Sequence, residues 1–304
     1  MTEMIRIPVE HEVDPAWVPD APLASPSASS GLLEVFRRSY LLRLLVRKEI
    51  QARYSGSFLG LFWTYVQPAV RFGLYFFVIG LVLGLHKNVE NFGIHMFAGF
   101  VIVHYFTETF SAGTRSIVRN KAILRKMAMP REMFPVASML VSAFHVVPGL
   151  VILTVACLGV GWTPDPAGVA AGLLGFAIVM VLGTALALLF SAANVFFRDF
   201  ANVVTTLTSF VTFSVPMIYP YSFVDERFGR FAEWYLLNPI AEAVLLMQRC
   251  FWVGTTSDPA ETARTDLPPN LWPLGFAHLA AALVVLAVAQ IVFSRLENKF
   301  AERL

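Results

Sequence analysis

The chain has 304 residues, of which 57% are hydrophobic and only 14% are charged. A soluble domain usually carries about 25% charged residues, so this composition argues against a soluble enzyme and indicates residence in a lipid bilayer. The formal net charge of +2 is too small to indicate nucleic-acid binding, and no nucleic-acid partner is expected. Cys157 and Cys250 lie far apart in apolar surroundings, where we expect packing and no disulfide.

The first part of the chain differs from the rest. Residues 1–31 contain five prolines and five acidic residues and lack an apolar run, which predicts a disordered cytoplasmic tail. Residues 32–58 are predicted to form a cytoplasmic interface helix, over 32–50, and the loop that follows it. That helix is interpreted either as an anchor in the lipid headgroups or as an anchor that also binds a protein partner.

Six stretches are long and apolar enough to cross a bilayer, because a helix needs about 20 residues to span about 30 Å of hydrocarbon. They are 63–85, 92–113, 133–160, 168–197, 200–219 and 271–294. A seventh apolar piece, 239–253, is too short and contains Glu242 and Arg249, so we expect a periplasmic re-entrant hairpin there. The sequence therefore predicts an all-α membrane protein with about six transmembrane helices, a permease domain over 59–294 and a cytoplasmic tail over 295–304.

Basic residues set the expected orientation. They gather at 37–53, at 115–131 and at 295–303, that is, before the first stretch, between the second and third, and after the sixth. Loops rich in Lys and Arg face the cytoplasm. The prediction is a multi-pass protein of the cytoplasmic (inner or plasma) membrane, in contact with membrane lipids, with both termini in the cytoplasm.

Three segments together resemble one family. The first segment has Arg53-Tyr54, Ser57, Leu59-Gly60, Trp63 and Pro68, the second runs from 116 to 135 through Pro130, and the third joins Arg198-Asp199 to 214–220 and 237–239. In this order they resemble the permease subunits of polysaccharide-exporting ABC transporters, which export O-antigen, teichoic acid or cell-wall galactan. One departure is Met129, where the family pattern leads us to expect Phe before the proline.

The resemblance implies the transmembrane subunit of an ATP-driven exporter of a polyprenyl-diphosphate-linked polysaccharide. Within that class, the Ala- and Val-rich composition and the absence of a capsule-specific feature favour galactan or O-antigen as cargo. The resemblance also implies a 2:2 complex of two permeases, the second being another copy of this chain, with two nucleotide-binding ATPase subunits. Each of the five lysines precedes Glu, Asn, Ala, Met or Phe, so this chain lacks the Gly-Lys-Ser/Thr of a phosphate-binding Walker A loop. We therefore expect no cofactor in this chain and Mg-ATP in the partner subunit.

The basic loop after the second stretch is the candidate contact with the ATPase. Residues 115–129 are predicted to form about four helical turns ended by Pro130, a rigid lever at the membrane face. Taken alone, this loop also fits an ordinary cytoplasmic loop bound to anionic lipid, and the resemblance favours coupling. The candidate coupling residues are Arg119, Asn120, Lys121, Leu124, Arg125, Lys126 and Pro130.

Aromatic residues indicate how a glycan is accommodated, because sugar rings stack on aromatic faces. In the family, the first and fifth helices of opposite protomers line the channel. The candidate lining residues are Tyr65, Phe72 and Phe76 on the first stretch and Phe210, Phe213 and Tyr219 on the fifth. Core packing or lipid contact is the alternative for each of them.

Charged residues inside the stretches are also candidates. Arg71 lies within the first stretch, where a charge is costly unless it faces water or a partner, so it is a candidate to meet the diphosphate or sugar of the cargo. A structural salt bridge or a side chain that reaches the membrane surface is the alternative. His104 and Glu108 are four residues apart and are interpreted as a polar pair between helices, without a third ligand for a metal.

Other classes of protein fit the sequence less well. A membrane-embedded glycosyltransferase or acyltransferase lacks support, since no Asp-x-Asp occurs and no catalytic set shares a loop. A related exporter of a drug or small lipid shares the expected fold but does not need the aromatic track. A scaffold without transport activity gives no reason for the coupling loop. No catalytic residue is therefore assigned.

Overall fold

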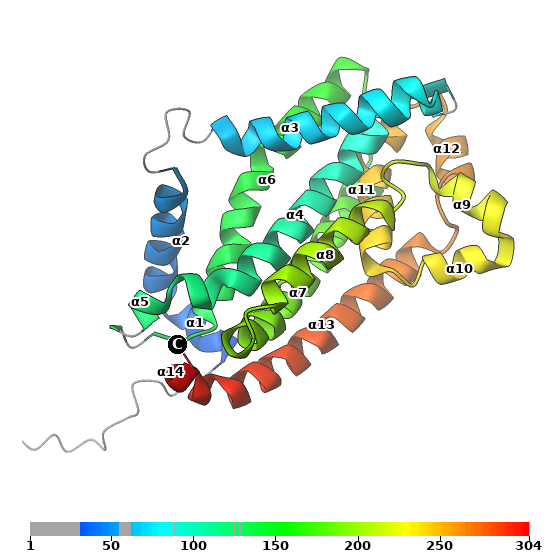
Figure 1. Cartoon of the computed structure of the whole chain (residues 1–304). Helices are drawn as coiled ribbons and strands as arrows, with labels where there is room; N and C mark the ends of the chain where they lie inside the picture. Colours follow the sequence, from blue (N-terminus) through cyan, green and yellow to red (C-terminus); the bar gives the residue numbers. More distant parts are fainter. Residues whose placement is uncertain (1–30, 55–61, 88, 125, 128, 304) are drawn as a thin grey trace, which may run out of the picture.

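The computed structural model describes residues 31–54, 62–87, 89–124, 126–127 and 129–303. All regular structure within these residues is helical, which confirms the all-α prediction (Figure 1). Residues 1–30 of the predicted tail, most of the loop before the first stretch, and Arg125 lie outside the described residues, so the expectations for them stay predictions.

Five helices form the packed core of the bundle. α7 lies at its centre and contacts α4, α11 and α13, while α6 packs on the other side of α4. Small residues allow these close approaches: a Cβ added at Gly113 of α4 would lie 2.4 Å from the Cβ of Ala187 on α7. The core helices are α4 (Phe92–Arg119), α6 (Met133–Gly159), α7 (Pro166–Phe196), α11 (Pro239–Phe251) and α13 (Leu271–Leu296).

Two helices lie at the edge of this core. α3 (Trp63–Tyr75) continues into a π-helical segment, η2 (Phe76–Val82), and α8 is Phe200–Phe213. Figure 1 shows α3 running along one side of the molecule, apart from α8. Few side chains of α3 are buried, in contrast to those of α4. The space between α3, α4 and α8 is where a cavity forms.

The short elements gather at two ends (Figure 1). The end that we call the α2 end holds α1 (Leu32–Arg37), α2 (Ser39–Tyr54), α5 (Lys121–Leu124), η6 (Glu297–Lys299) and α14 (Phe300–Arg303). The opposite end, the α12 end, holds η3 (Leu85–Lys87), α9 (Tyr221–Phe228), η4 (Gly229–Phe231), α10 (Ala232–Tyr235), η5 (Val253–Thr255) and α12 (Pro259–Thr265). The predicted interface helix is thus two helices, which separate at Arg38.

Four segments of the described residues are long and apolar enough to cross a membrane: Tyr65–Val82, Met133–Gly159, Pro166–Phe196 and Leu271–Lys299. They agree with the first, third, fourth and sixth predicted stretches. α4 has 28 residues, about 42 Å of helix, but it carries polar side chains that its neighbours bury. α8 has only 14 residues. For α4 and α8, crossing the membrane stays a prediction.

α11 occupies the segment that was expected to be re-entrant. It has 13 residues and is capped at its N-terminus by Asn238, whose side chain accepts a hydrogen bond from the Ile240 N–H. Most of its length is buried against α7, α4 and α13. A helix of 13 residues is about 20 Å long, which is shorter than the hydrocarbon layer. The re-entrant arrangement stays a prediction.

Candidate functional site

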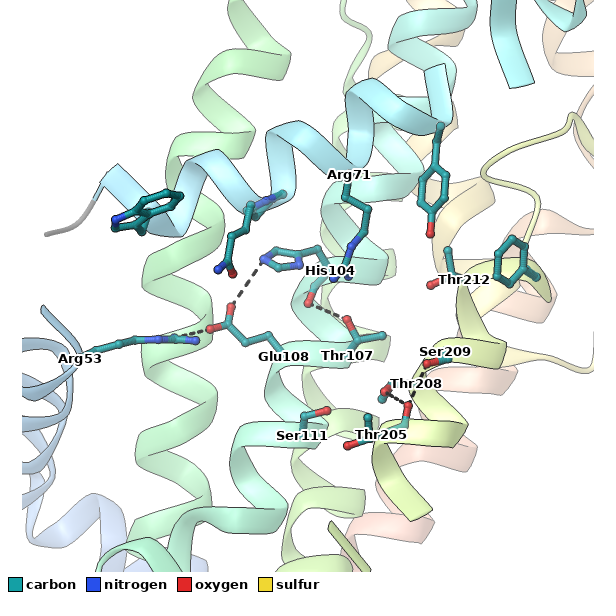
Figure 2. Close-up of a pocket in the computed structure, with 15 residues that line it drawn as sticks. Arg53, Arg71, His104, Thr107, Glu108, Ser111, Thr205, Thr208, Ser209 and Thr212 are labelled. Carbon is teal, nitrogen blue, oxygen red and sulfur yellow. Dashed lines mark hydrogen bonds and ion pairs between the residues drawn. The ribbon is translucent and has the colours of Figure 1, made fainter. Parts of the chain in front are cut away.

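A cavity of about 790 Å³ opens between α3, α4 and α8, and Figure 2 shows the side chains that line it. Its volume is within the range of about 300 to 1,000 Å³ that is common for ligand sites. We call it the main cavity. Its lining residues are Arg53, Trp63, Gln67, Pro68, Arg71, Tyr75, His104, Thr107, Glu108, Ser111, Thr205, Thr208, Ser209, Thr212 and Phe213.

Hydroxyl groups form one wall of the main cavity. On α8 they belong to Thr205, Thr208, Ser209 and Thr212, whose spacing places them on a single helical face (Figure 2). The Thr208 hydroxyl donates to the Val204 carbonyl at 2.9 Å, and the Ser209 hydroxyl donates to the Thr205 carbonyl at 3.0 Å. Because a hydroxyl that donates to its own helix still has lone pairs, this wall offers acceptor oxygens to the cavity.

The hydroxyl wall was not recognised in the sequence. Its signal is present as Thr-x-x-Thr-Ser-x-x-Thr over 205–212, inside an otherwise apolar stretch. α4 completes the wall with Thr107 and Ser111. A polar helix face that looks into a cavity of a membrane protein indicates a path for a polar ligand.

Arg71 lies in the wall that α3 contributes. Its side chain extends from α3 toward His104 of α4 (Figure 2). No carboxylate of the described residues lies within ion-pair distance of Arg71, so among them the alternative of a structural salt bridge finds no partner. Arg71 is therefore a cation available to a ligand in the main cavity.

An ionic cluster lies in the wall of the main cavity, and Figure 2 shows its members Arg53, His104 and Glu108. Arg53 Nη1 of α2 donates to Glu108 Oε1 of α4 at 2.5 Å and lies 2.8 Å from His145 Nδ1 of α6. His145 Nδ1 is also 2.8 Å from Glu108 Oε1, and His104 Nε2 is 3.8 Å from Glu108 Oε2. The predicted pair of His104 and Glu108 is thus part of a larger cluster that ties three helices together.

The aromatic candidates divide into two groups. Phe213 lines the main cavity, and Tyr65 lines a neighbouring cavity of about 80 Å³ together with His104 and His145. The hydroxyl of Tyr219 donates to the Phe213 carbonyl at 3.1 Å, while Phe210 is exposed on α8. Phe213 and Tyr65 thus line cavities, whereas Phe210 and Tyr219 are not among the residues that line these two, and their channel role stays a prediction.

Phe72 and Phe76 instead pack against aromatic rings of α4. The ring centroid of Phe72 is 4.8 Å from that of Phe97, and that of Phe76 is 6.2 Å from that of Phe92. Such contacts hold α3 and η2 on α4. Within one chain, the main cavity receives its aromatic lining from Trp63, Tyr75 and Phe213, and a channel role for Phe72 and Phe76 stays a prediction.

The candidate coupling residues lie at the α2 end, and two of them bond to α2. Arg119 forms an ion pair with Glu49. The Asn120 side chain accepts a hydrogen bond from Lys48 Nζ at 2.9 Å and donates to Glu49 Oε1 at 2.7 Å. Beside these contacts, a cavity of about 230 Å³ lies between α2, α4 and α6, and Arg53 borders it as well.

The other coupling candidates surround the short helix α5. Lys121 and Lys126 are exposed, Leu124 is half-buried and Pro130 is buried, whereas Arg125 lies outside the described residues. The predicted lever is not one continuous helix: α4 ends at Arg119, and α5 contains only four residues. The Asn120 amide is engaged by α2, and asparagine favours such side-chain contacts over a helix interior, which accounts for the break. Coupling itself stays a prediction.

Comparison with known proteins places these features in a family. The sequence profile of the ABC-2 type transporter family matches residues 40–251. Over 271 residues the chain is 27% identical to the O-antigen export system permease protein RfbA of Myxococcus xanthus, covering 88% of this chain and 97% of that protein. It is also 24% identical, over 275 residues and with the same coverage, to a protein of the same name in Klebsiella pneumoniae. The family is one of transport subunits and not of enzymes, and the profile match spans most of the chain, so this protein belongs to the ABC-2 type transporter family.

Proposed function

We propose that this chain is the membrane subunit of an exporter that moves a polysaccharide, carried on polyprenyl diphosphate, across the cytoplasmic membrane. The observation that carries the proposal is the main cavity, where hydroxyl groups and aromatic rings line a hollow inside an apolar bundle. The curated relatives, named as permeases of O-antigen export, support the same cargo class.

A glycan presents two kinds of surface, and the main cavity offers a partner for each. Sugar hydroxyls donate hydrogen bonds to acceptors such as the oxygens of Thr208, Ser209 and Thr212. Sugar C–H faces stack on rings such as Tyr75 and Phe213, which give contact area without fixed hydrogen-bond geometry. A polymer can therefore move along the walls while it exchanges similar contacts.

Membership of the ABC-2 family implies an ATP-binding partner subunit. We propose two copies of this chain and two ATPase subunits. Apolar side chains next to the main cavity support a second copy: Phe210 and Phe213 of α8 are 69% and 61% exposed. In this arrangement α3 and α8 face the other protomer, and the two main cavities contribute to one path.

The proposed orientation places the α2 end in the cytoplasm. The basic residues of α1, α2 and α5 all lie at that end, as the positive-inside rule requires. The ATPase then meets Lys121 and Lys126, the exposed cations of the coupling loop. In this proposal all six predicted stretches span the membrane, and α11 is a re-entrant helix near the outer surface.

Co-purification tests the proposal. The chain is expressed with the ATPase encoded beside it, and the mass of the purified complex is measured. We expect a 2:2 complex whose ATP hydrolysis rises several-fold when a polyprenyl-diphosphate-linked glycan is added. Glycans of the O-antigen and galactan types are compared to identify the cargo.

Two outcomes would contradict the proposal. One is a complex that hydrolyses ATP at the same rate with and without every lipid-linked glycan but responds to a small lipid. The other is a purified chain that translocates glycan with no companion subunit. A complex with a substitution in the ATPase that blocks hydrolysis is the control, because glycan must not move in its vesicles.

A further inference from the structure

A second hollow of about 500 Å³ lies next to the main cavity, on the side of the α2 end. Four arginines, Arg53, Arg115, Arg119 and Arg198, border it, and Glu108 is the one carboxylate among its lining residues. We call it the arginine vestibule. The four arginines come from α2, from α4 and from the turn between α7 and α8, so three parts of the chain contribute cationic side chains to this lining.

Two of these four cations lack a carboxylate partner among the described residues. Arg115 Nη2 donates to Thr205 Oγ1 at 2.7 Å and to the Ala201 carbonyl at 3.3 Å, and both acceptors are neutral. No carboxylate of the described part of the chain lies within ion-pair distance of Arg198. By contrast, Arg53 pairs with Glu108 and Arg119 with Glu49. The vestibule therefore has an excess of positive charge that the carboxylates of the described residues do not neutralise.

The vestibule and the main cavity share a wall. Arg53, Glu108 and Ser111 line both hollows. In addition, the hydrogen bond from Arg115 reaches Thr205, the first residue of the hydroxyl wall. An anion held in the vestibule would thus lie directly beside the surface that is suited to a glycan.

We propose that the arginine vestibule binds the diphosphate end of the lipid-linked cargo before the glycan enters the main cavity. This inference rests on the proposed function. Guanidinium groups bind phosphate oxygens through paired, charge-assisted hydrogen bonds, and two unneutralised arginines provide one such group for each phosphate of a diphosphate. Arg115 is already oriented by Thr205 and Ala201, so less freedom is lost on binding.

The test measures binding of farnesyl diphosphate, a short polyprenyl diphosphate without glycan, to the complete permease–ATPase complex in nanodiscs of neutral lipid. The variant combines Arg115→Gln with Arg198→Gln. The matched control combines Arg37→Gln with Arg43→Gln, two exposed arginines of α1 and α2 that border none of the four hollows described above. All four side chains are exposed, so neither pair of substitutions leaves a void in the core.

We expect the dissociation constant of farnesyl diphosphate to rise at least about tenfold in the Arg115 and Arg198 variant and to stay within about twofold in the control. Farnesol, which has no phosphate, is expected to bind equally to all three proteins. Equal affinity of the variant and the unsubstituted complex overturns the proposal, as does an equal loss in the control. Displacement of farnesyl diphosphate by a similar concentration of phosphatidylglycerol also overturns it, because the vestibule would then be a site for bulk lipid.

The two proposals fail in different ways. If farnesyl diphosphate binding depends on Arg115 and Arg198 but no lipid-linked glycan stimulates ATP hydrolysis, the proposed function fails and an anion site remains. If glycan stimulates hydrolysis equally in the complex and its variant, and binding is unchanged, the assignment of the vestibule fails and the exporter remains.

Discussion

α7 and α4 are the two longest helices of the bundle, and both are largely buried, yet they bury different kinds of side chain. α7 has no charged residue and uses glycines to approach its neighbours. α4 contains Glu108, Arg115 and Arg119 and lines both the main cavity and the arginine vestibule. α7 therefore holds the helices of the bundle together, whereas α4 contributes side chains to the candidate site.

The difference shows how a polar helix can occupy a membrane protein. α4 packs against α6, α7, α8 and α11, so much of its surface meets protein and its hydroxyl and charged groups face the cavity. α7 packs against α11 and α13 through small and apolar side chains of its own, and an unpaired charge at these positions would be costly. Substitutions on α7 should therefore affect assembly, and substitutions around α4 should affect transport.

The largest effect is expected for Gly175→Leu on α7. A Cβ at this position would lie 2.9 Å from the Ala243 carbonyl oxygen of α11, and backbone cannot move aside as a side chain can. We expect a loss of about 3 kcal/mol in the free energy of unfolding, followed in detergent as a lower melting temperature and a lower yield of monodisperse protein. Gly73→Leu on α3 is the control, because nothing lies within 4 Å of its added Cβ. Equal melting temperatures of the Gly175→Leu and Gly73→Leu variants would contradict the conclusion that close packing of α7 stabilises the bundle.

A substitution at Glu108 tests the other helix. Glu108→Ala removes the carboxylate that contacts both Arg53 and His145, so Arg53 of α2 loses its ion pair with α4 and keeps its contact with His145 Nδ1. We expect the export rate to fall at least about tenfold, with a cost of about 1 to 3 kcal/mol in the free energy of unfolding. Vesicle export and melting are measured together. Glu226→Ala, at an exposed site of α9, should change neither, and an unaltered export rate in Glu108→Ala would remove the cluster from the mechanism.

A smaller effect is expected at the hydroxyl wall. Thr208→Val with Thr212→Val removes two acceptor oxygens from the main cavity at nearly constant volume. Since one hydrogen bond contributes about 0.5 to 1.5 kcal/mol, the glycan concentration for half-maximal ATP hydrolysis should rise about fivefold. Thr206→Val is the matched control on the same helix, because Thr206 does not line the cavity. If the control shifts as much as the variant, the wall has no direct contact with glycan.

The smallest effect is expected at the start of α7. Both Nη atoms of Arg249 donate to the Asp165 carboxylate at 2.8 Å, and this hydrogen bonding lowers the pKa of Asp165 below its ordinary value of 3.8. A lowered pKa in the folded state means that the stabilisation is complete above about pH 4 and is lost as the pH falls through the folded value. Asp165→Asn should therefore reduce the free energy of unfolding at pH 7 by less than about 1 kcal/mol, which is followed as a slightly lower melting temperature. Below the folded pKa of Asp165, the substituted and unsubstituted proteins should melt alike. A difference that grows toward low pH would contradict this assignment.

The sequence predicted best what depends on long apolar runs. The stretches 133–160 and 271–294 agree closely with α6 and α13, because a continuous hydrophobic run determines where such a helix begins and ends. Arg71 was also recognised, since a charge within an apolar stretch is conspicuous whatever the fold. The position of an apolar helix and the presence of a charge within it can both be read from one continuous segment of the sequence.

Contacts between distant segments were not predictable in this way. Arg53 and Glu108 are separated by 55 residues and belong to different helices, and no periodicity relates them. The break after Arg119 likewise depends on the bonds of Asn120 to α2. The packing of Phe72 and Phe76 on α4 depends on which face of α3 turns inward, and an aromatic-rich helix does not reveal this.

Arg53 borders the hollows of about 790, 500 and 230 Å³ at once. Glu108 and Ser111 also line the two larger hollows, so the carboxylate that lies 2.5 Å from Arg53 Nη1 belongs to the wall that these hollows share. Because Arg53 lies in the last turn of α2, any displacement of that helix would alter the linings of all three hollows together.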